Sequence, residues 1–136
     1  MLLMGVLIMG CSSGKLCCTR FSQESAEATY CNNHRDAVGK YINVSRDPAE
    51  RRDRLERIKK LYDRIKFCES VECIETEIYS DRTRELLPGF EARYAVDHEF
   101  AEQEAPVRGQ DRARLILCGF RHAIQVVEEK LKREGY

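Results

Sequence analysis

Apolar residues recur along most of this chain at steps of three and four. The clearest run follows Asp47 and comprises Leu55, Ile58, Leu61, Tyr62 and Ile65. This spacing places the apolar side chains on one face of an α-helix. Asp47 and Pro48 mark its start, because Asp is a favoured N-cap and Pro is favoured at the first helical position. No stretch shows the sustained alternation that indicates a β-strand.

Four other segments are also predicted to be helical. They cover residues 22–41, 71–87, 90–105 and 112–133, and they are separated by Pro88 and Gly89 and by residues 106–109. The last one is the most apolar and is the expected centre of the core, with a stripe formed by Leu115, Ile116, Cys118, Phe120, Ile124, Val127 and Leu131. The sequence therefore predicts an all-α fold, a small helical bundle of four to five helices that forms a single domain over residues 22–136.

The residues before Cys11 are apolar and uncharged. A membrane-spanning helix needs about 20 such residues, so residues 1–10 are expected to be an export signal peptide that is removed. Residues 8–11 (IMGC) resemble the bacterial lipobox, which implies a lipid on Cys11. The first basic residue is Lys15, which indicates that the signal is incomplete at its start. The alternative is a short apolar segment packed into a core.

The lipobox resemblance also implies a location. Residues 11–21 would be the lipidated cysteine and a flexible tether in front of the helical domain. Ser12 stands where an aspartate retains many such lipoproteins in the inner membrane. We therefore expect a lipoprotein of the bacterial cell envelope, anchored in the outer membrane through its lipid and facing the periplasm.

This location changes what the cysteines are expected to do. If Cys11 carries lipid, the remaining ones are Cys17, Cys18, Cys31, Cys68, Cys73 and Cys118. An oxidising periplasm favours up to three disulfides among them. A bond between Cys68 and Cys73 would pin two successive helices into a hairpin.

The other pairings stay open at this point. A bond between Cys31 and Cys118 would join the first and last helices, with Cys17 and Cys18 bonded elsewhere or to each other. The three histidines would then be ordinary surface or boundary residues, namely His34, His98 and His122. The alternative is a tetrahedral zinc site built from two Cys/His pairs, each one helical turn apart, comprising Cys31, His34, Cys118 and His122. The favoured interpretation has no metal and no cofactor.

The charges balance in sum but not along the chain. Residues 67–105 hold eleven acids and three arginines, so this segment carries minus eight while the whole chain is neutral. Such a segment can steer a positively charged partner, although it can also serve solubility alone.

The stretch from Cys68 to Leu86 resembles the signature of the LprI-like family of lysozyme inhibitors. Two cysteines flank a short turn between helices, and an aliphatic residue, an arginine and a leucine follow along the next helix. The matching positions are Cys68, Cys73, Ile74, Arg82 and Leu86. The resemblance covers roughly residues 50–87. It implies a small, exported, helical protein with a disulfide, of a family in which some members inhibit lysozyme.

Lysozyme inhibition would suit the acidic segment. Many lysozymes are basic proteins with a carboxylate pair in the cleft, so an inhibitor needs a negative surface and a neutral or basic side chain that meets those carboxylates. The candidates for partner binding are Tyr79, Arg82 and Arg84. The alternative is that both arginines pair with acids of their own helix.

Enzymatic and nucleic-acid functions have little support in the sequence. It contains no Gly-rich phosphate loop, nucleophile elbow or zinc-protease motif. Its basic helix lacks interleaved aromatic residues, and its pI is about 6.8. We therefore expect an envelope-anchored, non-enzymatic lipoprotein that binds another protein, most specifically a lysozyme inhibitor of LprI-like type. The alternatives are a periplasmic immunity protein against a secreted toxin and a Cys/His metal-binding envelope protein.

Overall fold

The computed structural model describes residues 26–104 and 110–136 of the chain. The expected signal peptide, the lipidated Cys11, the tether, Cys17 and Cys18 lie outside these residues. Within them, no helix is long and apolar enough to cross a membrane.

All regular structure in the described residues is helical, as predicted. The helices are α3 (Ala26–Ile42), α4 (Pro48–Ile65), α5 (Val71–Ile78), α6 (Asp81–Leu86), α7 (Phe90–Glu104) and α8 (Gln110–Arg133). The predicted number of four to five was too low, because the single helix expected over residues 71–87 is two helices. Ser80 is the reason: its side chain caps α6 by accepting a hydrogen bond from the Thr83 amide, while its hydroxyl donates to the carbonyl of Glu77 at the end of α5.

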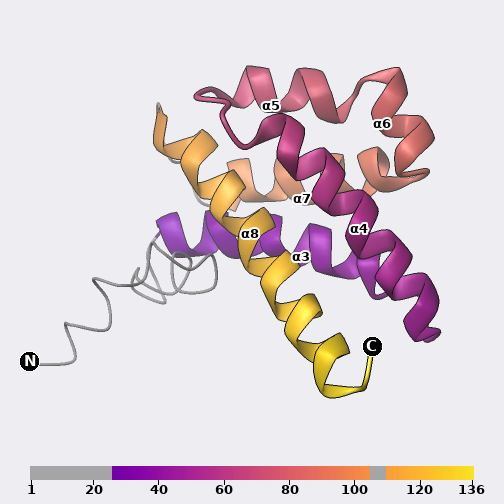
Figure 1. Cartoon of the computed structure of the whole chain (residues 1–136). Coiled ribbons are helices and arrows are strands. Elements are labelled where there is room, and N and C mark those ends of the chain that lie inside the picture. The colour runs from indigo at the N-terminus through magenta and orange to yellow at the C-terminus, as the bar shows by residue number, and fades with distance from the viewer. Residues whose placement is uncertain (1–25, 105–109) are drawn as a thin grey trace, which may run out of the picture.

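Helix α3 lies at the centre of the packing, against α8 on one side and α7 on another. Figure 1 shows α8 crossing in front of α3, with α5 and α6 together at the top of the view. Gly119 permits the close approach of α8 to α3. A Cβ atom at this position would lie 2.7 Å from the Cys31 carbonyl oxygen and 2.9 Å from the Arg35 amide nitrogen.

The buried apolar residues form one contiguous cluster to which α3, α4, α5, α7 and α8 all contribute. The predicted stripe of α8 lies inside it, and only Ile124 is partly exposed among its seven members. Rings from three helices meet in the middle: Phe90 and Tyr94 of α7 contact Phe120 of α8, and Phe90 also meets Tyr41 of α3 edge to face. This core fixes which face of α7 points inward.

Candidate functional site

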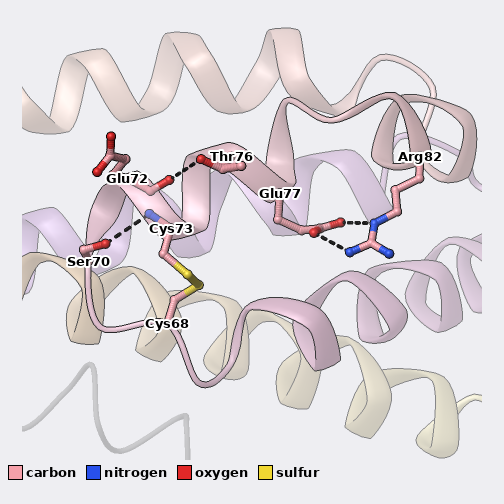
Figure 2. The surroundings of a disulfide bond; sticks show 7 residues. All are labelled: Cys68, Ser70, Glu72, Cys73, Thr76, Glu77 and Arg82. Carbon is pink, nitrogen blue, oxygen red and sulfur yellow. Dashed lines mark hydrogen bonds and ion pairs between the residues drawn. A yellow bond between two sulfur atoms is a disulfide. The ribbon is translucent and has the colours of Figure 1, made fainter.

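A disulfide joins the turn that follows α4 to the first turn of α5. Cys68 and Cys73 form the predicted bond, with their Cα atoms 5.6 Å apart. Ser70 lies between them and caps α5, since its hydroxyl accepts a hydrogen bond from the Cys73 amide at 3.1 Å (Figure 2). The bond and the cap together fix the direction in which α5 leaves the turn. By the loop-entropy model so short a loop contributes about 2 kcal/mol.

The remaining described cysteines do not pair with each other. Cys31 is disulfide-bonded, but its partner is not among the described cysteines. Cys118 is a buried thiol, and the Arg121 guanidinium approaches its sulfur to 3.8 Å. The alternative of a Cys31–Cys118 disulfide is therefore wrong, because the Cys31 sulfur has already formed its one bond elsewhere.

The structure does not assemble the alternative zinc site. In residues 26–104 and 110–136, no group of three or more His, Cys, Asp and Glu side chains is placed to hold a metal ion. Zinc binds cysteine as a thiolate, which a disulfide sulfur cannot supply. His34 turns its Nε2 atom towards His98 instead of towards Cys118 or His122.

The three candidates for partner binding lie close along the chain but do not converge on one point. Arg82 donates two hydrogen bonds to the Glu77 carboxylate, at 2.8 and 2.7 Å (Figure 2). Arg84 pairs with Asp81 and with Glu91 of α7. Tyr79 is half-buried, and its ring meets that of Tyr94 edge on.

The ion pair at Arg82 leaves its guanidinium at the surface in a fixed orientation. The side chain of Arg82 is 62% exposed, whereas that of Glu77 is only 14% exposed. The hydrogen bond from Arg82 lowers the pKa of Glu77 despite the opposing effect of burial. A planar fork held on a rigid carboxylate loses little conformational freedom when it meets a further acceptor.

Several acids on α5, α6 and α7 and in the turn before α5 have no ion-pair partner in the described residues. Those that make no ion pair within the described part of the chain are Glu69, Glu72, Glu85, Asp97 and Glu99. Four of them are exposed, and Asp97 is half-buried. Their charges are therefore available to act on a molecule outside the protein.

Helix α7 carries apolar side chains on both of its faces. Its inner face buries Phe90, Tyr94 and Ala101. Its outer face presents Val96, 67% exposed, and Phe100, 51% exposed, one helical turn apart. Val96 and Phe100 are thus two exposed apolar side chains on neighbouring turns of the side of α7 that faces away from the core.

A buried polar cluster connects α3 to α7, and the sequence interpretation missed it. His34 is fully buried, His98 is 8% exposed and His122 is 5% exposed, so the expectation that the histidines are ordinary surface or boundary residues was wrong. His34 Nε2 and His98 Nδ1 lie 2.8 Å apart. The spacing contained the signal: His34 follows Tyr30 by four residues, and His98 follows Tyr94 by four, so each lies on the core face of its helix.

The carboxylate of Glu102 organises the other side of this cluster. Its Oε2 atom accepts a hydrogen bond from the Tyr30 hydroxyl at 2.6 Å and from Arg112 of α8 at 2.6 Å. Burial raises the pKa of Glu102, but these two donors outweigh it and bring the pKa below its usual value. Burial lowers the pKa of His34 to about 4, against the opposing effect of its hydrogen bond to the Tyr30 carbonyl. The cluster therefore combines an ionised carboxylate with a neutral imidazole.

The described residues define the class: a small all-α protein with a disulfide between Cys68 and Cys73 and with exposed acids on and near α5, α6 and α7. Comparison of the chain with family models, with curated proteins and with solved structures found no match in any of the three. The resemblance to the LprI-like family therefore rests on the residues of the turn and of the two helices that follow it.

Proposed function

We propose that this protein binds a positively charged partner protein through α7 and the exposed acids on and near α5, α6 and α7, and most specifically that it inhibits lysozyme. The observation that carries the proposal is the outer face of α7, where Val96 and Phe100 are exposed. These two side chains would supply the apolar contact, and the acids around them would supply the charge complementarity.

The two contributions have different physical roles. Burying a Val or Phe side chain completely is worth about 1.5–3 kcal/mol, and apolar anchors of this kind carry much of the affinity of an interface. Surface charges mainly raise the association rate and exclude partners of the same sign. Glu99 lies on α7 between Val96 and Phe100 in the sequence, so both contributions come from one helix.

Lysozyme is the proposed partner because the turn and α6 resemble those of the LprI-like family. The guanidinium of Arg82 could donate hydrogen bonds to a carboxylate in the lysozyme cleft, and its hydrogen bond to Glu77 would orient it for this contact. Tyr79 and Arg84 are the accompanying candidates. The same proposal includes lipid attachment at Cys11 and a periplasmic location at the outer membrane. The disulfide between Cys68 and Cys73 is consistent with such an oxidising compartment.

The test is titration of the purified, oxidised chain into activity assays of lysozymes from more than one class. We expect loss of activity at near-stoichiometric ratio for at least one class. Replacing Val96 and Phe100 together by Ser should weaken inhibition at least tenfold. The matched control replaces Val44 and Phe67 by Ser, since these residues are of the same two types, are also exposed and lie outside α7.

Three results would contradict parts of the proposal. If no lysozyme class is inhibited, the lysozyme assignment fails, and binding of a basic toxin would then favour the immunity-protein alternative. If the α7 variant and the control weaken inhibition equally, α7 is not the interface. Unchanged inhibition after Arg82→Ala would remove Arg82 from the binding residues.

A further inference from the structure

A groove lies between the second half of α3 and residues 122–127 of α8, near the crossing of these two helices in Figure 1. Its volume is about 410 Å³, a size typical of small-molecule sites. The residues that line it are Arg35, Asp36, Gly39, Lys40, Asn43, His122, Ala123, Val126 and Val127. None of them lies on α5, α6 or α7, so the groove shares no residue with the surface proposed above to bind a partner protein.

Part of the lining of this groove is apolar. Ala123 and Val127 are almost fully buried, whereas Val126 is 41% exposed. At Gly39 no atom lies within 4 Å of the Cβ that a larger residue would add, so the space above this position is open. An apolar group that enters the groove would cover Val126 and remove apolar surface from water.

Lysine side chains supply positive charge beside this apolar lining. Lys40 is exposed and makes no ion pair within the described part of the chain. Arg35 and Asp36 pair with each other at 2.8 Å, so their charges largely cancel. Lys130 is also exposed and follows Val126 by one helical turn on the same side of α8. The groove therefore matches a ligand with an apolar body and an anionic end.

The walls of the groove favour a ligand whose body has no hydrogen-bonding groups. Both walls are helices, whose interior N–H and C=O groups bond to each other along the helix. They offer no strand edge with which an extended peptide could pair. An alkyl chain needs no such partner, and a carboxylate at its end accepts a charge-assisted hydrogen bond from a lysine ammonium.

We propose that this groove binds a single-chain carboxylate of the medium-chain fatty-acid class. The alkyl chain lies against Gly39, Ala123 and Val126, and the carboxylate meets the ammonium group of Lys40. Lys130 adds to the positive field that attracts the carboxylate. The site does not depend on what α7 binds.

The test is titration of decanoate, below the concentration at which it forms micelles, into the ¹⁵N-labelled full chain, followed by two-dimensional NMR. We expect saturable shifts, fitted by one site, for amides around Gly39 and around Val126. Decyltrimethylammonium has an alkyl chain of the same length and the opposite charge. It should bind about tenfold more weakly, the effect of losing one charge-assisted hydrogen bond. Equal binding of the two probes, or no saturable shift with decanoate, would overturn the proposal.

Two pairs of variants test the two ends of the site separately. Gly39→Leu fills the open space and Lys40→Gln removes the charge, and each should weaken decanoate binding about tenfold. The control for the first is Ala49→Leu, at an exposed position of α4, and the control for the second is Lys60→Gln, at another exposed lysine. Circular dichroism would confirm that all four variants are folded. If the variants and their controls bind decanoate equally well, the groove is not its site.

Discussion

Two glycines inside helices should respond to the same substitution with opposite signs. Gly39 in α3 has no atom within 4 Å of the Cβ that Ala would add, whereas Gly119 in α8 faces the backbone of α3. In a helix interior, replacing Gly by Ala is worth about 0.5–1 kcal/mol from backbone entropy alone. Gly39→Ala should therefore raise the free energy of unfolding by roughly that amount.

At Gly119 a steric cost opposes this gain. The new Cβ would lie 2.7 Å from the Cys31 carbonyl oxygen and 2.9 Å from the Arg35 amide nitrogen. Backbone atoms cannot rotate away, so α8 must move outward from α3. Overpacking of this kind typically costs about 1–3 kcal/mol, which exceeds the helix gain. Gly119→Ala should therefore lower the free energy of unfolding by about 1–2 kcal/mol.

Urea unfolding followed by circular dichroism measures both values under one set of conditions. The two proteins differ from the parent by the same methyl group, so the difference between them isolates the contact between α3 and α8. If Gly119→Ala stabilised the protein as much as Gly39→Ala, the helices would not approach as closely as described. That result would refute the packing argument and with it the central place of α3.

Three further predictions concern the turn, the α5–α6 break and acid stability. Replacing Cys68 and Cys73 together by Ser should lower the free energy of unfolding by about 2 kcal/mol, as measured by urea unfolding with unchanged helix content. Ser80→Ala should cost about 1 kcal/mol by removing the α6 cap; no loss in the same assay would contradict the capping role. The pKa of His34 is about 4 in the folded protein and 6.5 in the unfolded chain. The buried neutral imidazole therefore contributes fully to the free energy of unfolding above pH 6.5, and this contribution is lost as the pH falls towards 4. The loss, up to about 3 kcal/mol, should be absent in His34→Gln.

The pattern of apolar residues predicted the fold class well because the helices here are amphipathic around one core. The stripe of α8 and the face of α4 were both evident, since Leu, Ile and Phe recur there at helical spacing. The break between α5 and α6 was missed for a specific reason. Ser80 interrupts the helix by bonding to nearby backbone, and a Ser at that position is equally compatible with an uninterrupted exposed helix face.

The buried cluster was harder to predict because its members are far apart in the sequence. His34 and His98 are separated by 64 residues, and Tyr30 and Glu102 by 72. Spacing within a helix places His34 and His98 on inner faces, but it does not say which polar groups will meet there. Those partners depend on how α3, α5, α7 and α8 pack, which the order of the residues leaves open.

The acidic segment shows how packing changes the meaning of a charge count. The sequence gives no means of distinguishing the eleven acids of this segment. In the structure they differ in burial and in their ion-pair partners. Glu75 and Glu102 turn inward to the histidines, Glu77 positions Arg82, and the exposed acids such as Glu85 and Glu99 act on the solvent side. Arg64 and Arg112, from outside the segment, pair with Glu77 and Glu102, so the field of the segment is weaker than a charge of minus eight implies. Under the proposed partner binding, we therefore expect Val96 and Phe100 to contribute to the affinity, and replacing them tests that proposal.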